Sequence, residues 1–255
     1  MLDAIKRWIS GGSPGPDWSE FSEWAQRHGR VFRRAHGDAG FVVEGSFSKE
    51  PWRLEWGPPQ RVYITARELR LRMELQLPSS LQMLLMSRSL METLERETFE
   101  RYTVGNQTVI DTSTPEEMRW LAMFPKVTLQ HLAKEARPYY GAVAADAETA
   151  RQWVQGVLAQ RLADATTRLL RHEPPFLLMT LRGRLYLRME MPVPEPGTLS
   201  QAVSLFEAAA QAARAVGVAS AAREVRDSSE APHHWSDGSE HTAWTDLHPE
   251  PPKRE

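Results

Sequence analysis

The heptapeptide Leu69-Arg70-Leu71-Arg72-Met73-Glu74-Leu75 returns later in the chain as Leu185-Tyr186-Leu187-Arg188-Met189-Glu190-Met191. In both copies apolar and polar residues alternate, so that the apolar side chains share one face of a strand and the polar ones share the other. This pattern is typical of an antiparallel strand with one buried and one solvated face. A proline follows each copy, Pro78 and Pro194, and a helix-like segment follows each proline.

The repeated unit predicts an α+β fold in which antiparallel sheet is packed by helices. It also favours a pseudo-duplication of a helix–strands–helix unit; the alternative is that two strands in similar surroundings converged on one pattern. We expect residues 1–16 to form a short helix and a Gly/Pro linker, residues 17–140 a first α+β half, and residues 141–226 a second half or the remainder of one domain. Residues 227–255 are poor in aliphatic residues and rich in acidic residues, Ser, Pro and His, which predicts a disordered tail.

Local patterns predict the remaining elements. A capping signature at Asp17 begins a helix that ends near Gly29. The dipeptide Arg182-Gly183 between two strand-like runs predicts a tight hairpin. The further strands expected are 41–43, 52–56, 61–65, 68–77 and a short one over 108–110. The further helices expected are 81–98, 115–124, 129–136, 146–171 and one from 198 to about 216 or a turn or two further.

Composition narrows the class of protein. The chain has 255 residues, a net charge of −2 and 41% hydrophobic residues, enough to bury a substantial core. It has no cysteine, which excludes disulfides, thiolate metal sites and a cysteine nucleophile. No apolar run reaches the ~20 residues of a membrane span, and the first residues lack the apolar core of a signal peptide. With its Arg-rich, Lys-poor usage, we expect a cytoplasmic bacterial protein.

Four charged residues of the repeat are a candidate ligand site: Arg72, Glu74, Arg188 and Glu190. They lie on the polar faces of matching strands, and if the strands pair, two arginines and two glutamates gather into a polar pocket able to bind an anion. The alternative is a solvated face with cross-strand ion pairs of about 0.2–1 kcal/mol each.

Three tryptophans near the ends of the chain are candidate partner-binding residues. Trp235 and Trp244 lie in the acidic tail, where an exposed indole suits docking into a groove with a basic rim or folding back onto the body. The alternative is that the tail tolerates them without a role. Trp8 belongs to an amphipathic segment over 2–9, which suits packing on the body or a partner, or contact with a membrane surface.

The motifs of common catalytic sites are missing: the chain has no His-Glu-x-x-His, phosphate-binding loop, dinucleotide fingerprint or serine elbow. The sequence therefore predicts no catalytic residue, cofactor or metal, and the absence of a basic patch argues against nucleic acid. We expect a protein-binding or adapter module whose partner is a protein of unknown identity. The alternatives are a small-ligand-binding protein or enzyme with an Arg/Glu site between the halves, and a peripheral membrane protein; the oligomeric state stays open.

Overall fold

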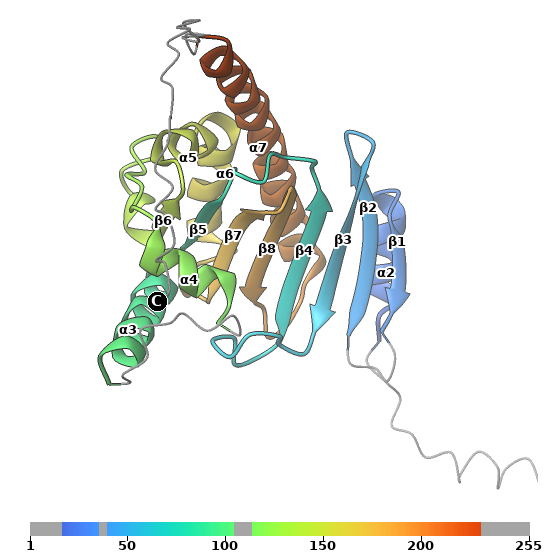
Figure 1. The fold of residues 1–255 in the computed structure, drawn as a ribbon. Helices are drawn as coiled ribbons and strands as arrows, with labels where there is room; N and C mark the ends of the chain where they lie inside the picture. The colour runs from blue at the N-terminus through green and yellow to red at the C-terminus, as the bar shows by residue number, and fades with distance from the viewer. Residues whose placement is uncertain (1–16, 36–39, 105–113, 231–255) are drawn as a thin grey trace, which may run out of the picture.

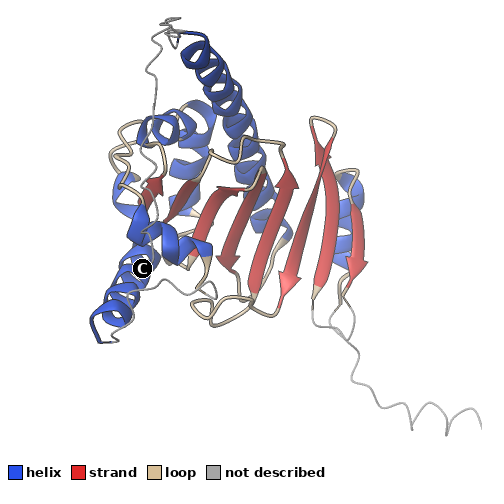
Figure 2. Ribbon diagram, viewed as in Figure 1, coloured by secondary structure: helices blue, strands red, loops and turns tan. Residues whose placement is uncertain are grey.

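Eight strands form one antiparallel sheet in the order β1-β2-β3-β4-β8-β7-β5-β6 (Figure 1). The computed structural model describes residues 17–35, 40–104 and 114–230. Helices lie on both faces of the sheet (Figure 2), which confirms the α+β class with an antiparallel sheet. The strands are β1 (Val31–Arg34), β2 (Phe41–Phe47), β3 (Glu50–Gly57), β4 (Glu68–Glu74), β5 (Met83–Ser87), β6 (Tyr140–Ala144), β7 (Phe176–Leu181) and β8 (Arg184–Glu190).

The two copies of the repeated heptapeptide lie side by side as β4 and β8, the central strands of the sheet. They pair antiparallel, with Leu71 opposite Leu187 and Met73 opposite Leu185. Strands of both predicted halves therefore belong to one sheet, and β5 of the first half lies between β6 and β7 of the second.

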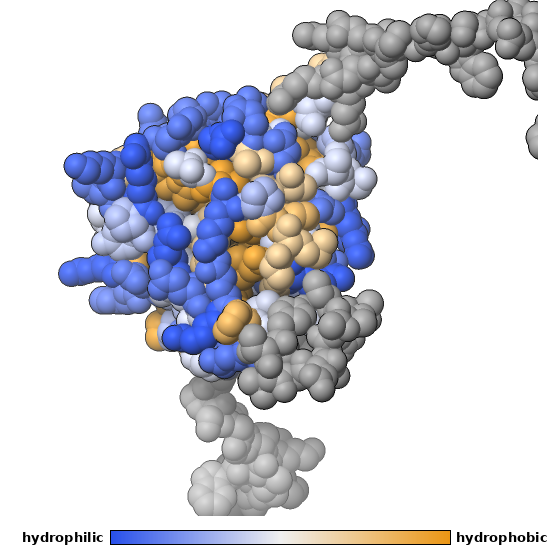
Figure 3. Space-filling view, turned by 60° about the vertical axis from the view of Figure 1, so that its left-hand side comes forward, coloured by the Kyte–Doolittle hydropathy of each residue, from blue (hydrophilic) through white to orange (hydrophobic). Residues whose placement is uncertain are grey.

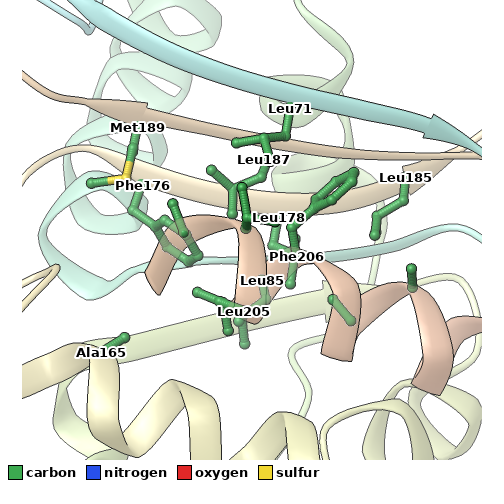
Figure 4. Packing of buried hydrophobic residues seen from close by; sticks show 14 of the residues in the cluster. Leu71, Leu85, Ala165, Phe176, Leu178, Leu185, Leu187, Met189, Leu205 and Phe206 are labelled. Atoms are coloured by element: carbon green, nitrogen blue, oxygen red, sulfur yellow. The ribbon is translucent and has the colours of Figure 1, made fainter. Parts of the chain in front are cut away.

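The alternating apolar residues of the repeat face a core beneath four helices: α2 (Ser19–Arg27), α5 (Ala147–Trp153), α6 (Gly156–Thr167) and α7 (Pro196–Glu230). Helix α7 crosses this face and buries Leu199, Val203, Phe206 and Ala210, which share one side of a helix. Figure 4 shows Phe206 directed at the sheet near Leu178 and Leu185. The helix thus seals the apolar faces of the central strands.

The other face of the sheet is covered only in part. Helices α3 (Arg88–Val104) and α4 (Glu116–Met123) pack on β5, β6 and β7 through a second core that contains Leu84, Met86, Leu177 and Met179. In the part of the chain that the structure describes, no helix covers β2, β3 and β4 on this face (Figures 1 and 2). These strands carry charged residues there, because apolar side chains alternate onto the opposite face.

Burial on both faces explains one predicted element that is wrong and one strand that was not predicted. Residues 81–98 were expected to form one helix, but Met83–Ser87 form strand β5 and α3 begins at Arg88. All five residues of β5 are buried, and so are all five of Tyr140–Ala144, a strand that the sequence did not predict. A strand buried on both faces loses the apolar–polar alternation that distinguishes it from a helix.

Other boundaries differ for local reasons. Residues 61–65 lie in an irregular connection, and 129–136 form turns. The single helix expected over 146–171 is two helices, because Gln155 is extended and Gly156 has a φ of 56°. The hairpin at Arg182-Gly183 is confirmed, with both residues at positive φ as a tight turn requires.

Helix α7 is longer than expected, since it continues through Glu230 into the segment predicted to be disordered. Residues 1–16 and 231–255, with Trp8, Trp235 and Trp244, lie outside the described residues, as does the short strand expected over 108–110. Among the helices that are described, none is long and apolar enough to cross a membrane.

Candidate functional site

A groove of about 620 Å³ lies on the uncovered part of the second sheet face. It is near the end of the sheet where β4 ends and β8 begins. Three arginines and two glutamates contribute to its lining, with Tyr186 and Pro51 as less polar neighbours. The full lining is Glu44, Pro51, Trp52, Arg53, Arg72, Met73, Glu74, Arg184 and Tyr186.

The register of the sheet places arginines directly opposite each other twice. Arg70 of β4 faces Arg188 of β8, and Arg72 of β4 faces Arg53 of β3. Like charges at directly opposite positions of an antiparallel pair destabilise the sheet unless a carboxylate lies between them. The two pairs differ in whether they have that carboxylate.

The Arg70–Arg188 pair is bridged by Glu68, whose side chain is 0% exposed. One oxygen of Glu68 is 2.5 Å from Arg188, and the other is 3.2 Å from Arg70 and accepts a hydrogen bond from the backbone N–H of Gln60. Glu55 pairs with Arg70 at 3.1 Å as well. This pair of arginines is therefore neutralised within the protein.

In the Arg53–Arg72 pair, only the charge of Arg53 is neutralised by carboxylates. Arg53 pairs with Glu44 at 3.0 Å and with Glu55 at 2.6 Å. The hydrogen bond with Glu55 raises the pKa of Arg53, so its charge is firmly held. Arg72 is exposed and has no ion pair with any residue that the structure describes. The groove therefore contains an uncompensated guanidinium beside a second arginine.

The connection between β3 and β4 closes the opposite end of this face. Glu190 accepts hydrogen bonds from the backbone N–H groups of Thr65 and Ala66, at 2.7 and 3.1 Å. Burial alone would raise the pKa of Glu190, but these hydrogen bonds outweigh it and lower the pKa. Glu190 thus anchors a loop and is not free to contact a ligand in the groove.

Helix α4 is held to the same connection by a buried carboxylate. Glu117, 1% exposed, accepts hydrogen bonds from Arg61 Nε at 2.6 Å and from the Tyr63 hydroxyl at 2.7 Å. Burial acts to raise the pKa of Glu117, but Arg61 and Tyr63 outweigh it and the pKa is lowered. Burial and the Glu117 charge raise the pKa of Tyr63, so this hydroxyl remains a donor.

Glu117→Gln is expected to lower the free energy of unfolding near neutral pH by about 1–3 kcal/mol, because Arg61 loses its carboxylate. A lowered pKa means that the contribution of Glu117 is present above the ordinary glutamate value of 4.5 and is lost as the pH falls through the value in the folded protein. The difference between wild type and variant should therefore narrow as the pH falls below the ordinary glutamate value. Urea unfolding at a series of pH values measures it; a difference independent of pH would contradict the assignment.

The four predicted ligand-binding residues all lie on one face of β4 and β8, but the structure brings only Arg72 and Glu74 to the groove. Arg188 is 15% exposed and pairs with Glu68, and Glu190 holds the loop at Thr65 and Ala66. A ligand-binding role for these residues stays a prediction.

Arg53 and Tyr186 line the groove but were not among the candidate ligand-binding residues from the sequence. Arg53 lies on the polar side of the alternating segment Trp52–Trp56, so the same pattern that places Arg72 could have found it. Tyr186 occupies the position of the second heptapeptide that Arg70 holds in the first, and it lies opposite Arg72. Their joint placement depends on strand register, which the sequence does not encode locally.

A different side of the molecule, which carries α3 and α4, has a continuous patch of hydrophobic surface bordered by hydrophilic side chains (Figure 3). Among the side chains of these two helices that the structure describes, Phe99 in α3 and Met123 in α4 are large, apolar and exposed. Within residues 17–35, 40–104 and 114–230, no group of three or more His, Asp or Glu side chains is placed to hold a metal ion.

Comparisons with known proteins add little. No protein-family model and no curated protein matches the sequence. Among solved structures, the crystal structure of the mycobacterial trehalose monomycolate transport factor A, TtfA, matches with a TM-score of 0.45 and 8% identity, over 76% of this chain and 93% of that one. A similarity this weak carries no argument about function.

Proposed function

We propose that this protein is a non-enzymatic binding module that recognises an acidic, extended segment of another protein through the groove around Arg72. The observation that carries the proposal is the exposed Arg72, opposite a second arginine and without a carboxylate partner in the described part of the chain. The cost of opposing like charges is removed when a ligand carboxylate binds between them.

The chemistry of the groove favours a carboxylate ligand. A guanidinium presents a planar fork of N–H donors that matches both oxygens of a carboxylate, and such charge-assisted pairs are among the stronger hydrogen bonds. Glu44 and Glu74 at the rim already pair with Arg53 and Arg184 respectively, so their charges are balanced locally. An acidic side chain entering the groove therefore meets Arg72 as the unbalanced charge.

The open shape of the groove favours a chain segment. It extends over β2, β3, β4 and β8 and is open to solvent along the face, and Tyr186 and Pro51 offer surfaces on which an apolar side chain packs. A small anionic ligand is the second candidate, because about 620 Å³ is within the usual volume of small-molecule sites.

Arg72→Ala is expected to weaken binding of a fluorescein-labelled peptide that contains several Glu and two Trp residues by about 10–100-fold, the loss of one charge-assisted pair. Fluorescence anisotropy with the full chain measures the dissociation constant. The dissociation constant of Arg72→Lys should lie between those of the wild type and Arg72→Ala, because lysine keeps the charge but lacks the planar fork of N–H donors. Raising the ionic strength from about 0.05 M to about 0.5 M should weaken peptide binding by the wild type more than peptide binding by Arg72→Ala.

The matched control is Arg171→Ala, which removes an exposed arginine outside the groove. It should bind the peptide as the wild type does. Equal affinities for wild type and Arg72→Ala, or equal losses for both arginine variants, would overturn the proposal. Displacement of the peptide by millimolar citrate in an Arg72-dependent manner would favour the small anionic ligand instead.

A further inference from the structure

We propose that the groove around Arg72 also binds an acidic segment of this same chain, residues 231–252, which competes with the partner. The inference rests on the proposed function, because both occupants use the same arginine. It assigns to the site a means of regulation: a partner binds only by displacing the chain's own carboxylates.

Charge complementarity is the first argument. Residues 231–252 contain four carboxylates, Asp237, Glu240, Asp246 and Glu250, and no lysine or arginine. The groove contains Arg72 without an internal partner, next to Arg53. With its four histidines neutral, the segment carries only negative charges and is attracted to an unbalanced guanidinium. Binding is further favoured because the two are held at high effective concentration in one molecule.

The position of α7 is the second argument. This helix crosses the face of the sheet opposite to the groove and its carboxyl end, at Glu230, extends past the strands (Figure 1). The carboxyl end of α7 passes the edge of the sheet at which β4 ends and β8 begins. The groove residues Glu74 and Arg184 lie at this same edge. An extended chain spans about 3.3 Å per residue, so residues 231–252 reach roughly 70 Å, more than is needed to pass over this edge.

The aromatic residues of the segment are the third argument. Trp235 and Trp244 flank the first two carboxylates, Asp237 and Glu240. The groove has Tyr186 beside Arg72, and an indole packs favourably on both an aromatic ring and a guanidinium. A segment that offers both carboxylates and indoles thus matches a groove that offers a guanidinium and a phenol.

The absence of cysteine from the chain allows two spin labels to be placed without removing native residues. Ser46→Cys puts one label on an exposed position of β2 at the groove end of the sheet, and Ser239→Cys puts the other between Asp237 and Glu240. Double electron–electron resonance on the full chain should show a narrow, short distance. Arg72→Ala should replace it with a broad, longer distribution, and Arg171→Ala should leave it unchanged. A distribution that is broad in the wild type, or unaffected by Arg72→Ala, would overturn the inference.

A second measurement separates this inference from the proposed function. A full-length variant with Asp237→Asn, Glu240→Gln, Asp246→Asn and Glu250→Gln should bind a synthetic 231–252 peptide about tenfold more tightly than the wild type, because it has no internal competitor. If both chains bind the peptide equally and Arg72→Ala weakens both, the proposed function stands and self-competition is wrong. If Arg72→Ala weakens neither, both proposals fail.

Discussion

Glu68→Gln is expected to lower the free energy of unfolding by about 3–5 kcal/mol, among the largest effects of any single substitution in this protein. Glu68 is fully buried and neutralises two arginines that β4 and β8 place opposite each other. The substitution keeps the shape of the side chain and removes the charge, so that Arg188 loses its carboxylate and Arg70, still paired with Glu55, lies opposite it; both arginines are only 15% exposed. Urea unfolding followed by circular dichroism measures the loss.

Glu74→Gln is the matched control, since it makes the same change six residues further along the same face of β4. Glu74 is 58% exposed and pairs with Arg184, which is 49% exposed. Solvent screens such a pair, and the expected loss is about 0–1 kcal/mol. Similar losses for both variants would show that Glu68 does not act as a buried bridge.

Phe206→Ala is expected to lower the free energy of unfolding by about 3–5 kcal/mol. Phe206 is 0% exposed and directed from α7 at the central strands, near Leu178 and Leu185 (Figure 4). Its truncation removes buried apolar area and leaves a cavity that the sheet and the helix, both rigid elements, fill only in part.

Val218→Ala, at a position of the same helix that is 73% exposed, is the corresponding control. It should change the free energy of unfolding by no more than about 0.5 kcal/mol, as surface substitutions generally do. Thermal unfolding of both variants compares them. A small effect of Phe206→Ala would mean that α7 is not packed against the sheet as the structure has it.

The parts of the fold that the sequence predicted well are those in which one local pattern decides the structure. Alternation in Leu69–Leu75 and Leu185–Met191 assigned β4 and β8 and their buried faces, and Arg182-Gly183 assigned the hairpin. The pattern failed at Met83–Ser87, where α3 and α4 cover one face and the main core covers the other. Whether a second layer covers a strand is a tertiary property that the segment itself does not contain.

The candidate site shows the same division. Alternation placed Arg72 and Glu74 on the polar face of a strand, and the groove contains both. It placed Arg188 on an equivalent face but did not reveal that Glu68 pairs with it, because the two residues are brought together only by the antiparallel register of β4 and β8. A shift in that register would change which arginine lacks a carboxylate, and this is the property on which the proposed function depends.

The most direct test of the account observes the guanidinium of Arg72 itself. Arginine Nε–Hε signals in a ¹H–¹⁵N NMR spectrum are recorded for the full chain with the four carboxylates of residues 231–252 replaced by amides, and Arg72→Lys assigns the signal. On addition of the synthetic 231–252 peptide, the signal of Arg72 should shift in proportion to binding, while those of Arg70 and Arg188, already paired with Glu68, stay in place. Peptide binding that leaves the Arg72 signal unchanged would contradict the central claim.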